Sequence, residues 1–180
     1  MNLSDVIKTK RLKIIPFSKE YLTPRYISWL NDPEVVRYSN QRFQTHTLES
    51  CIEFLKSFEN SNNFFWAIIN QDKNLGHIGN VTAYVDIFNK VADIGILIGE
   101  KSAWKQGYGI ETWLAICDYL FNKVKLRKVT AGTAAKNKAM LGIMRCAGMK
   151  EDGRRIKQCL IDNKPIDHVY AALFREEFIK

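Results

Sequence analysis

Apolar and polar positions alternate along much of the chain with the two-residue period of β-strands, interrupted by stretches with the 3.6-residue period of helices. The apolar run FFWAII and the two strand-like segments after it are separated by polar turns, the first at residues 71–74, which predicts an antiparallel meander. A strand pattern returns on both sides of the turn DNKP, which predicts a closing hairpin. The predicted strands are residues 8–17, 64–69, 75–87, 91–99, 126–135, 157–161 and 168–174.

Local start signals mark the first predicted helices. Thr23 is a suitable N-cap, and Pro24 occupies the first helical position after it. The pair Asp32-Pro33 repeats this arrangement and predicts a short turn of helix in the residues that follow. Another helix is expected to start near Thr47, because apolar residues keep the helical period from there to residue 58.

Two more helices are predicted between and after the later strands. One begins within residues 104–112, directly after the glycines. Another runs from Asn137 to Gly148, a glycine typical of a helix C-terminus. Strand 91–99, the first of these helices and strand 126–135 form one β-α-β unit with parallel strands. The expected apolar face of that helix consists of Ile110, Trp113, Leu114, Cys117 and Phe121.

The 180 residues contain no repeat, linker or low-complexity stretch, so we expect a single mixed α/β (α+β) domain over residues 1–180. The net charge of +8 favours anionic partners but does not choose among nucleic acid, a membrane surface and small phosphorylated ligands. The four cysteines and three histidines lack the spacing of a zinc site, and we expect no metal. The first residues lack the apolar core of a signal peptide, which favours a reduced, cytoplasmic protein.

The stretch WKQGYGIET, residues 104–112, places two glycines between the end of a strand and the start of a helix. The first turn of a helix has backbone N–H groups without partners and carries the positive end of the helix dipole. Glycines there permit a positive φ and a close approach of a ligand to the backbone. The loop is therefore a candidate cradle for a phosphate or pyrophosphate, although a plain tight turn would also explain it. It matches neither the full dinucleotide fingerprint nor a P-loop.

The loop resembles the pyrophosphate-binding [QR]-x-x-G-x-[GA] loop of the GNAT superfamily of N-acetyltransferases, with Trp104 in the first place. Other stretches are similar to its RimJ/RimL-like branch, which includes the bacterial ribosomal-protein N-acetyltransferases. These stretches are KTKRLKIIPF, WLNDPEV, GHIGNV, ADIGILI, WKQGYGIE, Asn137 and Gly148-Met149, and they span nearly the whole chain in the family's order. The resemblance implies a GNAT-like fold whose mostly antiparallel central sheet is flanked by helices.

The resemblance also implies acetyl-CoA as the acetyl donor, inserted where strand 91–99 separates from strand 126–135. One backbone N–H of strand 91–99 would polarise the thioester carbonyl. Asn137 matches a family asparagine that contacts the cofactor, and it is equally a suitable N-cap. The implied cofactor residues are Ile96, Leu97 and Ile98 for the pantetheine arm, Lys105, Gln106, Gly107, Tyr108, Gly109 and Ile110 for the pyrophosphate, and Asn137.

The catalytic acid is not evident from the sequence. Relatives place a tyrosine or a serine after the helix asparagine, but this chain has Met144 and Met140 at those positions, and neither can donate a proton. The alternative donors are solvent and another side chain, Tyr170 or Tyr108. Asp93 is the best candidate for the base, because relatives often carry a glutamate there, although a surface carboxylate would explain it too. Glu111 and His77 are interpreted as structural residues.

Two acceptor classes remain open for an acetyl-CoA-dependent N-acetyltransferase acting on a primary amine. We favour a small amine, such as an amino sugar on a nucleotide, with Trp29 as part of the pocket wall and Arg37 and Arg42 meeting phosphates. The alternatives are a protein N-terminus and a catalytically degenerate module that binds coenzyme A. No DNA- or RNA-binding motif accompanies the charge, so we expect neither nucleic acid nor a membrane as partner. A homodimer is one expectation for its assembly.

Overall fold

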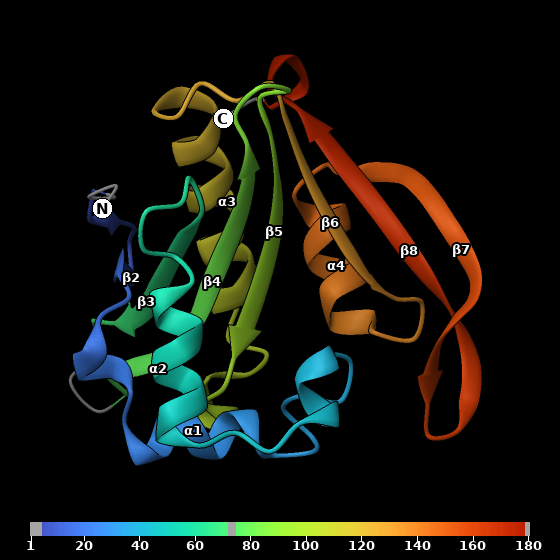
Figure 1. Ribbon diagram of the computed structural model, residues 1–180. Helices are drawn as coiled ribbons and strands as arrows, with labels where there is room; N and C mark the ends of the chain where they lie inside the picture. Colours follow the sequence, from blue (N-terminus) through green and yellow to red (C-terminus); the bar gives the residue numbers. More distant parts are fainter. Residues whose placement is uncertain (1–4, 72–74, 179–180) are drawn as a thin grey trace.

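A mixed eight-stranded sheet forms the centre of the protein, in the order β1-β2-β3-β4-β5-β6-β8-β7 (Figure 1). The structure, a computed structural model, describes residues 5–71 and 75–178. Among the described strands, β5 and β6 are parallel and the other neighbours are antiparallel, as the sequence predicts. The strands are β1 (Ile7–Lys8), β2 (Leu12–Pro16), β3 (Phe64–Asn70), β4 (His77–Asp86), β5 (Val91–Ile98), β6 (Lys128–Ala134), β7 (Lys150–Ile161) and β8 (Lys164–Phe174).

Helices cover the two faces of the sheet unequally. The helices are α1 (Pro24–Leu30), α2 (Leu48–Lys56), α3 (Tyr108–Asn122) and α4 (Lys138–Cys146). α3 and α4 pack on one face over the larger core, which includes Trp66 and Trp113, whereas α1 and α2 cover the other face over a smaller core around Phe65. In Figure 1 the front of β6, β8 and β7 carries none of these helices. No α-helix of the described residues therefore lies on this side of β6, β8 and β7.

Burial on both faces explains the continuous apolar run of β3. Residues 64–68 of this strand are buried, because α3 lies against one face of the sheet and α2 against the other. Phe64 and Trp66 stack at 4.9 Å between ring centroids on the α3 side, and Phe65 stacks on Phe17 at 4.0 Å on the opposite side. A strand with one solvated face would instead alternate.

The predicted helix starts are confirmed. Thr23 accepts a hydrogen bond from the backbone N–H of Tyr26, and Thr47 forms a capping box with Ser50. The start expected at Asp32-Pro33 is also present, because the Asp32 carboxylate accepts the N–H of Glu34 at 2.9 Å and the Val36 N–H bonds to the Asp32 carbonyl at 3.0 Å, although residues 34–38 continue as turns and not as a regular helix.

Three expectations about the elements need correction. The first predicted strand is split into β1 and β2 by a turn at residues 9–11. Leu114, expected on the apolar face of α3, is 39% exposed, while Ile116 and Leu120 are fully buried in its place. β7 begins at Lys150, earlier than the predicted hairpin strand. The turn expected at residues 71–74 falls mostly on residues outside the described part of the chain.

No helix within the described residues is both long and apolar enough to cross a membrane. The same residues contain no group of three or more histidine, cysteine, aspartate or glutamate side chains arranged to hold a metal ion.

Candidate active site

The parallel strands β5 and β6 pair only at their beginnings. Their register covers Val91 with Lys128, Ala92 with Val129, and Asp93 with Thr130. Beyond Asp93 the two strands diverge toward their C-terminal ends (Figure 1), while β5 stays paired with β4 along its whole length. Within residues 5–71 and 75–178, the edge of β5 that faces β6 therefore has no strand partner from Ile94 to Ile98, which leaves backbone donors and acceptors for another extended group.

Strand alternation decides which residues of β5 direct their backbone to this edge. Gly99 donates its N–H to the Ile78 carbonyl on β4 at 3.0 Å, so Leu97, two residues earlier, also directs its backbone toward β4. Ile96 and Ile98 direct theirs toward the divergence. The carbonyl of Ile98 already accepts a hydrogen bond from the Trp104 indole at 2.8 Å. Of the three residues implied for the pantetheine arm, Ile96 has both backbone groups best placed for that role.

The start of α3 has the backbone geometry of an anion cradle. Gly107 is the N-cap, in the left-handed region at φ +81°, and no side chain caps the helix. The other three α-helices all have a side-chain cap. Lys105, two residues earlier, is also at a positive φ of 61°. Within α3, the first N–H with a helical acceptor is that of Glu111, which bonds to the Gly107 carbonyl at 3.1 Å. The N–H groups of residues 108–110 are thus without an intrahelical acceptor.

A side-chain clamp holds this loop against the first strands. The Glu111 carboxylate accepts hydrogen bonds from the Thr9 hydroxyl at 2.6 Å, the Arg11 backbone at 2.9 Å and the Arg11 guanidinium at 2.6 Å. Arg11 also donates to the Gln106 carbonyl at 2.8 Å and lies over the Tyr108 ring at 4.4 Å. Burial alone would raise the pKa of Glu111, but these hydrogen bonds outweigh it and lower the pKa. The structural role predicted for Glu111 is confirmed.

Replacing Glu111 with glutamine is expected to lower the free energy of unfolding by about 1–2 kcal/mol at pH 7, because bonds to a charged acceptor are lost. The folded-state pKa is depressed below the ordinary 4.5, so the stabilisation is complete above that value and is lost as the pH falls through the folded pKa. Urea denaturation of both proteins at pH 7 and pH 3.5 measures this. A difference that does not shrink at the lower pH would contradict the assignment.

Gly109 lets α3 pack closely against α4, and Asn137 caps the start of α4. A Cβ on Gly109 would lie 2.9 Å from the side chain of Ile143, so the absence of a side chain lets α4 pack closely on α3. The Asn137 side chain accepts the Met140 N–H at 3.2 Å and donates to the Thr133 hydroxyl at 3.0 Å. Asn137 is therefore an N-cap, whatever further contact it makes. Met140 packs against the larger core.

Asp93 lies where the two strands begin to separate. It follows buried Ala92 and precedes buried Ile94, so its side chain is on the open face, where its carboxylate accepts a hydrogen bond from Thr130 at 2.8 Å. Burial by the strands on either side raises the pKa of Asp93, opposed by the Thr130 hydrogen bond and the charge of His168. A carboxylate with a raised pKa next to a solvent-open face suits proton transfer.

Tyr170 and His168 share that face on β8, with ring centroids 4.8 Å apart. The guanidinium of Arg155 lies over the Tyr170 ring at 5.3 Å, and the Cys159 sulfur is 3.3 Å from Nδ1 of His168. The structure therefore places the two predicted residues, Asp93 and Tyr170, on one open face. Sequence reasoning missed His168, since only the β6–β8 pairing places it beside the divergence.

His77, interpreted as a packing residue, lies among aromatic rings. Its ring is 5.1 Å from both Tyr21 and Trp29, measured between centroids, and its Nε2 is 2.9 Å from the Gly79 carbonyl. Burial lowers the pKa of His77 to about 4, so the ring is neutral at physiological pH. These contacts agree with a structural role.

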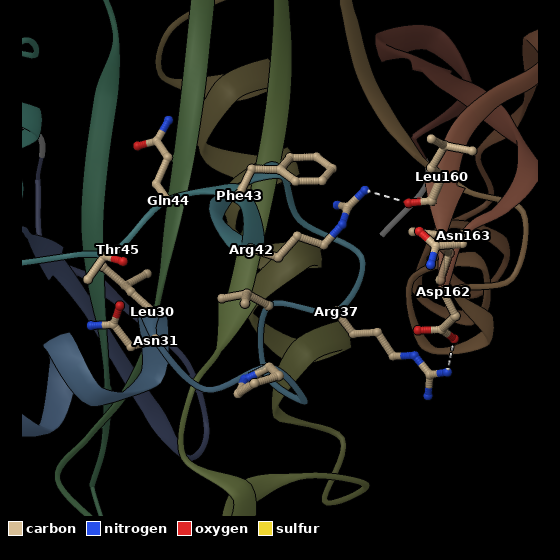
Figure 2. Close-up of a pocket in the computed structure, with 13 residues that line it drawn as sticks. Leu30, Asn31, Arg37, Arg42, Phe43, Gln44, Thr45, Leu160, Asp162 and Asn163 are labelled. Atoms are coloured by element: carbon tan, nitrogen blue, oxygen red, sulfur yellow. Dashed lines mark hydrogen bonds and ion pairs between the residues drawn. The ribbon is translucent and has the colours of Figure 1, made fainter.

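A cavity of about 490 Å³ separates the segment after α1 from the tip of the β7–β8 hairpin (Figure 2). Arg37 and Arg42, the two arginines predicted to meet phosphates, both line it. Arg37 is paired with Asp162 at 2.6 Å, and Arg42 donates to the Leu160 carbonyl at 3.1 Å, so both arginines tie the segment to the hairpin. The remaining lining residues are Leu30, Asn31, Pro33, Val36, Phe43, Gln44, Thr45, Ile161 and Asn163.

Trp29 does not line this cavity, contrary to its predicted place in the pocket wall. It is only 6% exposed and belongs to the smaller core. A Cβ on Gly99 would lie 2.1 Å from the indole, which shows how closely the ring covers the end of β5. Trp29 therefore packs against the residue that follows β5 and does not line the cavity proposed for the acceptor.

The family is shown by comparison with known sequences. The model of the acetyltransferase (GNAT) domain matches residues 11–150, which is most of the chain and includes the β5–α3–β6 unit and α4. The chain belongs to the GNAT acetyltransferase family and is an acetyltransferase.

Solved structures share the fold over nearly the whole chain at low identity. A GNAT-family acetyltransferase from Bacillus anthracis is 22% identical with a TM-score of 0.81, covering 96% of this chain and 100% of that one. Spermidine N-acetyltransferase from Vibrio cholerae, in complex with CoA and spermine, is 15% identical with a TM-score of 0.83, covering 96% and 100%. Ribosomal-protein-S5-alanine acetyltransferase from Vibrio fischeri is 12% identical with a TM-score of 0.80, covering 98% and 100%.

Proposed function

We propose that this chain is a single-domain, acetyl-CoA-dependent N-acetyltransferase that transfers the acetyl group to a primary amine. The observation that carries the proposal is the joint presence of an uncapped α3 N-terminus at Gly107 and an unpaired β5 edge. The first offers N–H groups and the positive dipole end to a pyrophosphate. The second offers backbone groups to an amide-containing arm. Acetyl-CoA has both features, joined in one molecule.

Most of the predicted cofactor residues have a specific part in this proposal, whereas Leu97 directs its backbone to β4 and the Ile98 carbonyl is held by Trp104. The backbone of residues 105–110 surrounds the pyrophosphate, with Arg11 steadying the loop through the Gln106 carbonyl. The backbone groups of Ile96 pair with the pantetheine arm, and an N–H of β5 near the start of the divergence polarises the thioester carbonyl. Asn137 contributes as the cap of α4, which keeps that helix alongside the arm.

A small amine is the acceptor class we favour, with a nucleotide-linked amino sugar as the candidate. Contacts from Arg37 and Arg42 bridge the cavity between the segment after α1 and the hairpin tip, which favours a compact ligand over an extended peptide. Arg42 is the stronger phosphate candidate, because its hairpin partner is a neutral carbonyl. The charge of Arg37 is already met by Asp162.

A protein N-terminus is the second candidate, within a RimJ/RimL-like branch. Its support is the fold shared with the Vibrio fischeri enzyme, whose name gives a ribosomal-protein alanine as acceptor. A cytoplasmic location would suit either acceptor. The third alternative, a module that only binds coenzyme A, is less favoured because Asp93, Thr130, Tyr170 and His168 together form a polar group on the open face.

Acetyl-CoA at a hundred times its dissociation constant should stabilise the protein by about 2.7 kcal/mol. Pantetheine at the same concentration should stabilise it far less, since it lacks the pyrophosphate that the α3 N-terminus would hold. Thermal and urea unfolding with each ligand measure the difference. Equal stabilisation by NADH, or none by acetyl-CoA, would overturn the proposed function.

Replacing Arg42 with alanine should raise the Michaelis constant for a UDP-linked amino sugar about tenfold or more, because a charge-assisted bond to phosphate is lost. The constant for the free amino sugar should not change, since that sugar has no phosphate. Arg37→Ala is the matched variant, with a smaller effect expected because Asp162 already neutralises Arg37. A thiol-release assay measures both. Acetylation of alanine-terminated peptides, with the nucleotide sugar left unmodified, would decide for the protein-modifying alternative.

A further inference from the structure

The two walls of the divergence lack side chains on the open face just beyond the last paired residues. Two positions after the pair Asp93–Thr130, the strands carry Gly95 on β5 and Gly132 on β6. A Cβ on Gly95 would lie 3.1 Å from the Thr82 hydroxyl. Neither strand therefore places a side chain of its own on the open face at this depth.

The imidazole of His168 fills the space that a side chain on Gly132 would need. A Cβ there would lie 2.6 Å from Nε2 of His168 and 3.1 Å from ring carbons of Tyr170. Nε2 is thus held over the β6 backbone at the edge of the divergence. Nδ1 points the other way, toward the sulfur of Cys159 at 3.3 Å. The Nδ1 side of the His168 ring therefore contacts β7, and the Nε2 side borders the divergence of β5 and β6.

We propose that His168 is a catalytic residue that accepts the proton of the acceptor amine at Nε2, with Cys159 as a positioning residue at Nδ1. The inference rests on the proposed acetyl transfer. The ammonium group gives one proton to Nε2, and the free amine nitrogen then forms a C–N bond to the thioester carbonyl carbon. The C–S bond breaks, the departing thiolate takes the second proton from nitrogen, and the imidazolium later releases its own proton to water.

The charged and titratable groups around the ring suit this role. Burial and the positive charge of Arg155 on β7 lower the pKa of His168, while the charge of Asp93 on β5 raises it. The net lowering leaves the imidazole neutral and able to accept a proton at pH 7. Asp93 then stabilises the imidazolium once it forms. Tyr170 on the same strand and Cys159 on β7 are the other titratable groups in contact with the ring.

The test is the pH dependence of kcat/KM for the best acceptor among spermidine, a UDP-linked amino sugar and an alanine-terminated peptide. His168→Gln should lower kcat at pH 7 about 100-fold or more, the usual contribution of a general base. Its acetyl-CoA affinity, measured by calorimetry, should stay within twofold. From pH 6 to 9 its kcat/KM should rise about tenfold per pH unit, because only the free amine reacts, whereas the unmodified enzyme should reach a plateau.

Two further variants separate a chemical role from a structural one. Asp93→Asn should move the acidic limb of the profile to lower pH, because the charge that raises the pKa of His168 is removed. Gly132→Ala keeps the imidazole but displaces it, so it should lower kcat with little change in acetyl-CoA affinity. A His168→Gln enzyme that keeps its kcat at pH 7 and the acidic limb of its kcat/KM profile would overturn this inference and leave the proposed function standing. An unmodified protein that binds no acetyl-CoA, or acetylates none of the three probes, would overturn the proposed function and this inference with it.

Discussion

Replacing Gly107 with alanine is expected to lower the affinity for acetyl-CoA about 100-fold. Gly107 is at φ +81°, where a residue with a Cβ is strained by roughly 1–2 kcal/mol. Relaxing that strain rotates the peptide groups at the start of α3 away from the pyrophosphate. Losing two bonds to a charged ligand would cost about 3 kcal/mol, which is roughly two decades in affinity. Calorimetry with acetyl-CoA measures the change.

Gly148→Ala is the matched control for that substitution. Gly148 is at φ +79°, and a Cβ there would meet nothing within 4 Å. It follows the C-terminus of α4, at the opposite end of that helix from Asn137. Both variants should therefore lose similar stability, about 1 kcal/mol, but only Gly107→Ala should lose affinity. Equal affinity for acetyl-CoA in the two variants would contradict the proposal that the start of α3 binds the pyrophosphate.

The second large effect is expected from Gly79→Ala, which should lower the free energy of unfolding by about 2–3 kcal/mol. A Cβ on Gly79 would lie 2.2 Å from the carbonyl oxygen of Leu97, and a backbone atom cannot move aside as a flexible side chain can. The two strands must separate where β5 forms the wall of the divergence. Urea denaturation measures the loss of stability.

Gly95→Ala tests the same strand pair with a milder contact. The nearest atom to its Cβ would be the Thr82 hydroxyl at 3.1 Å, so the stability should fall by less than about 1 kcal/mol. Its methyl group would stand on the open face beside Asp93, and turnover should fall even though the fold is kept. If Gly95→Ala were the less stable of the two variants, the packing argument for Gly79 would be wrong.

Local chemistry made the helix boundaries predictable from the sequence. Thr23, Thr47 and Asn137 each cap a helix with their own side chains, a contact that spans only three residues. The order of strands and the parallel β-α-β unit follow from the same local patterns, combined with the length of the connections.

Contacts between distant segments explain what the sequence did not predict. The turn that splits the first strand is held by Glu111, about a hundred positions along the chain. The first half of β7 was not predicted, because its exposed residues show no alternation of apolar and polar positions. The register of β7 against β8 also shifts between Arg155 and Cys159. Such a bulge leaves no periodic pattern.

Some residues of the candidate site could be predicted from local motifs, and others could not because distant contacts place them. The glycine loop before α3 is visible as a short motif, and so is the asparagine at the start of α4. His168 and Arg11 have no motif around them, and their places depend on the β6–β8 pairing and on the clamp to Glu111. Trp29 was misplaced because a large aromatic residue in a helix suits a pocket wall and a core equally well.

Hydrogen–deuterium exchange with and without acetyl-CoA tests the central claim most directly, because the proposed site consists largely of backbone N–H groups. Binding should slow exchange at Ile96 and Ile98 of β5, which direct their backbone toward the divergence, and at residues 108–110, whose N–H groups are without helix acceptors. The hairpin tip around Asp162 should be unaffected by the cofactor alone. Protection confined to the cavity at Arg37 and Arg42, with no change at the start of α3, would contradict the account.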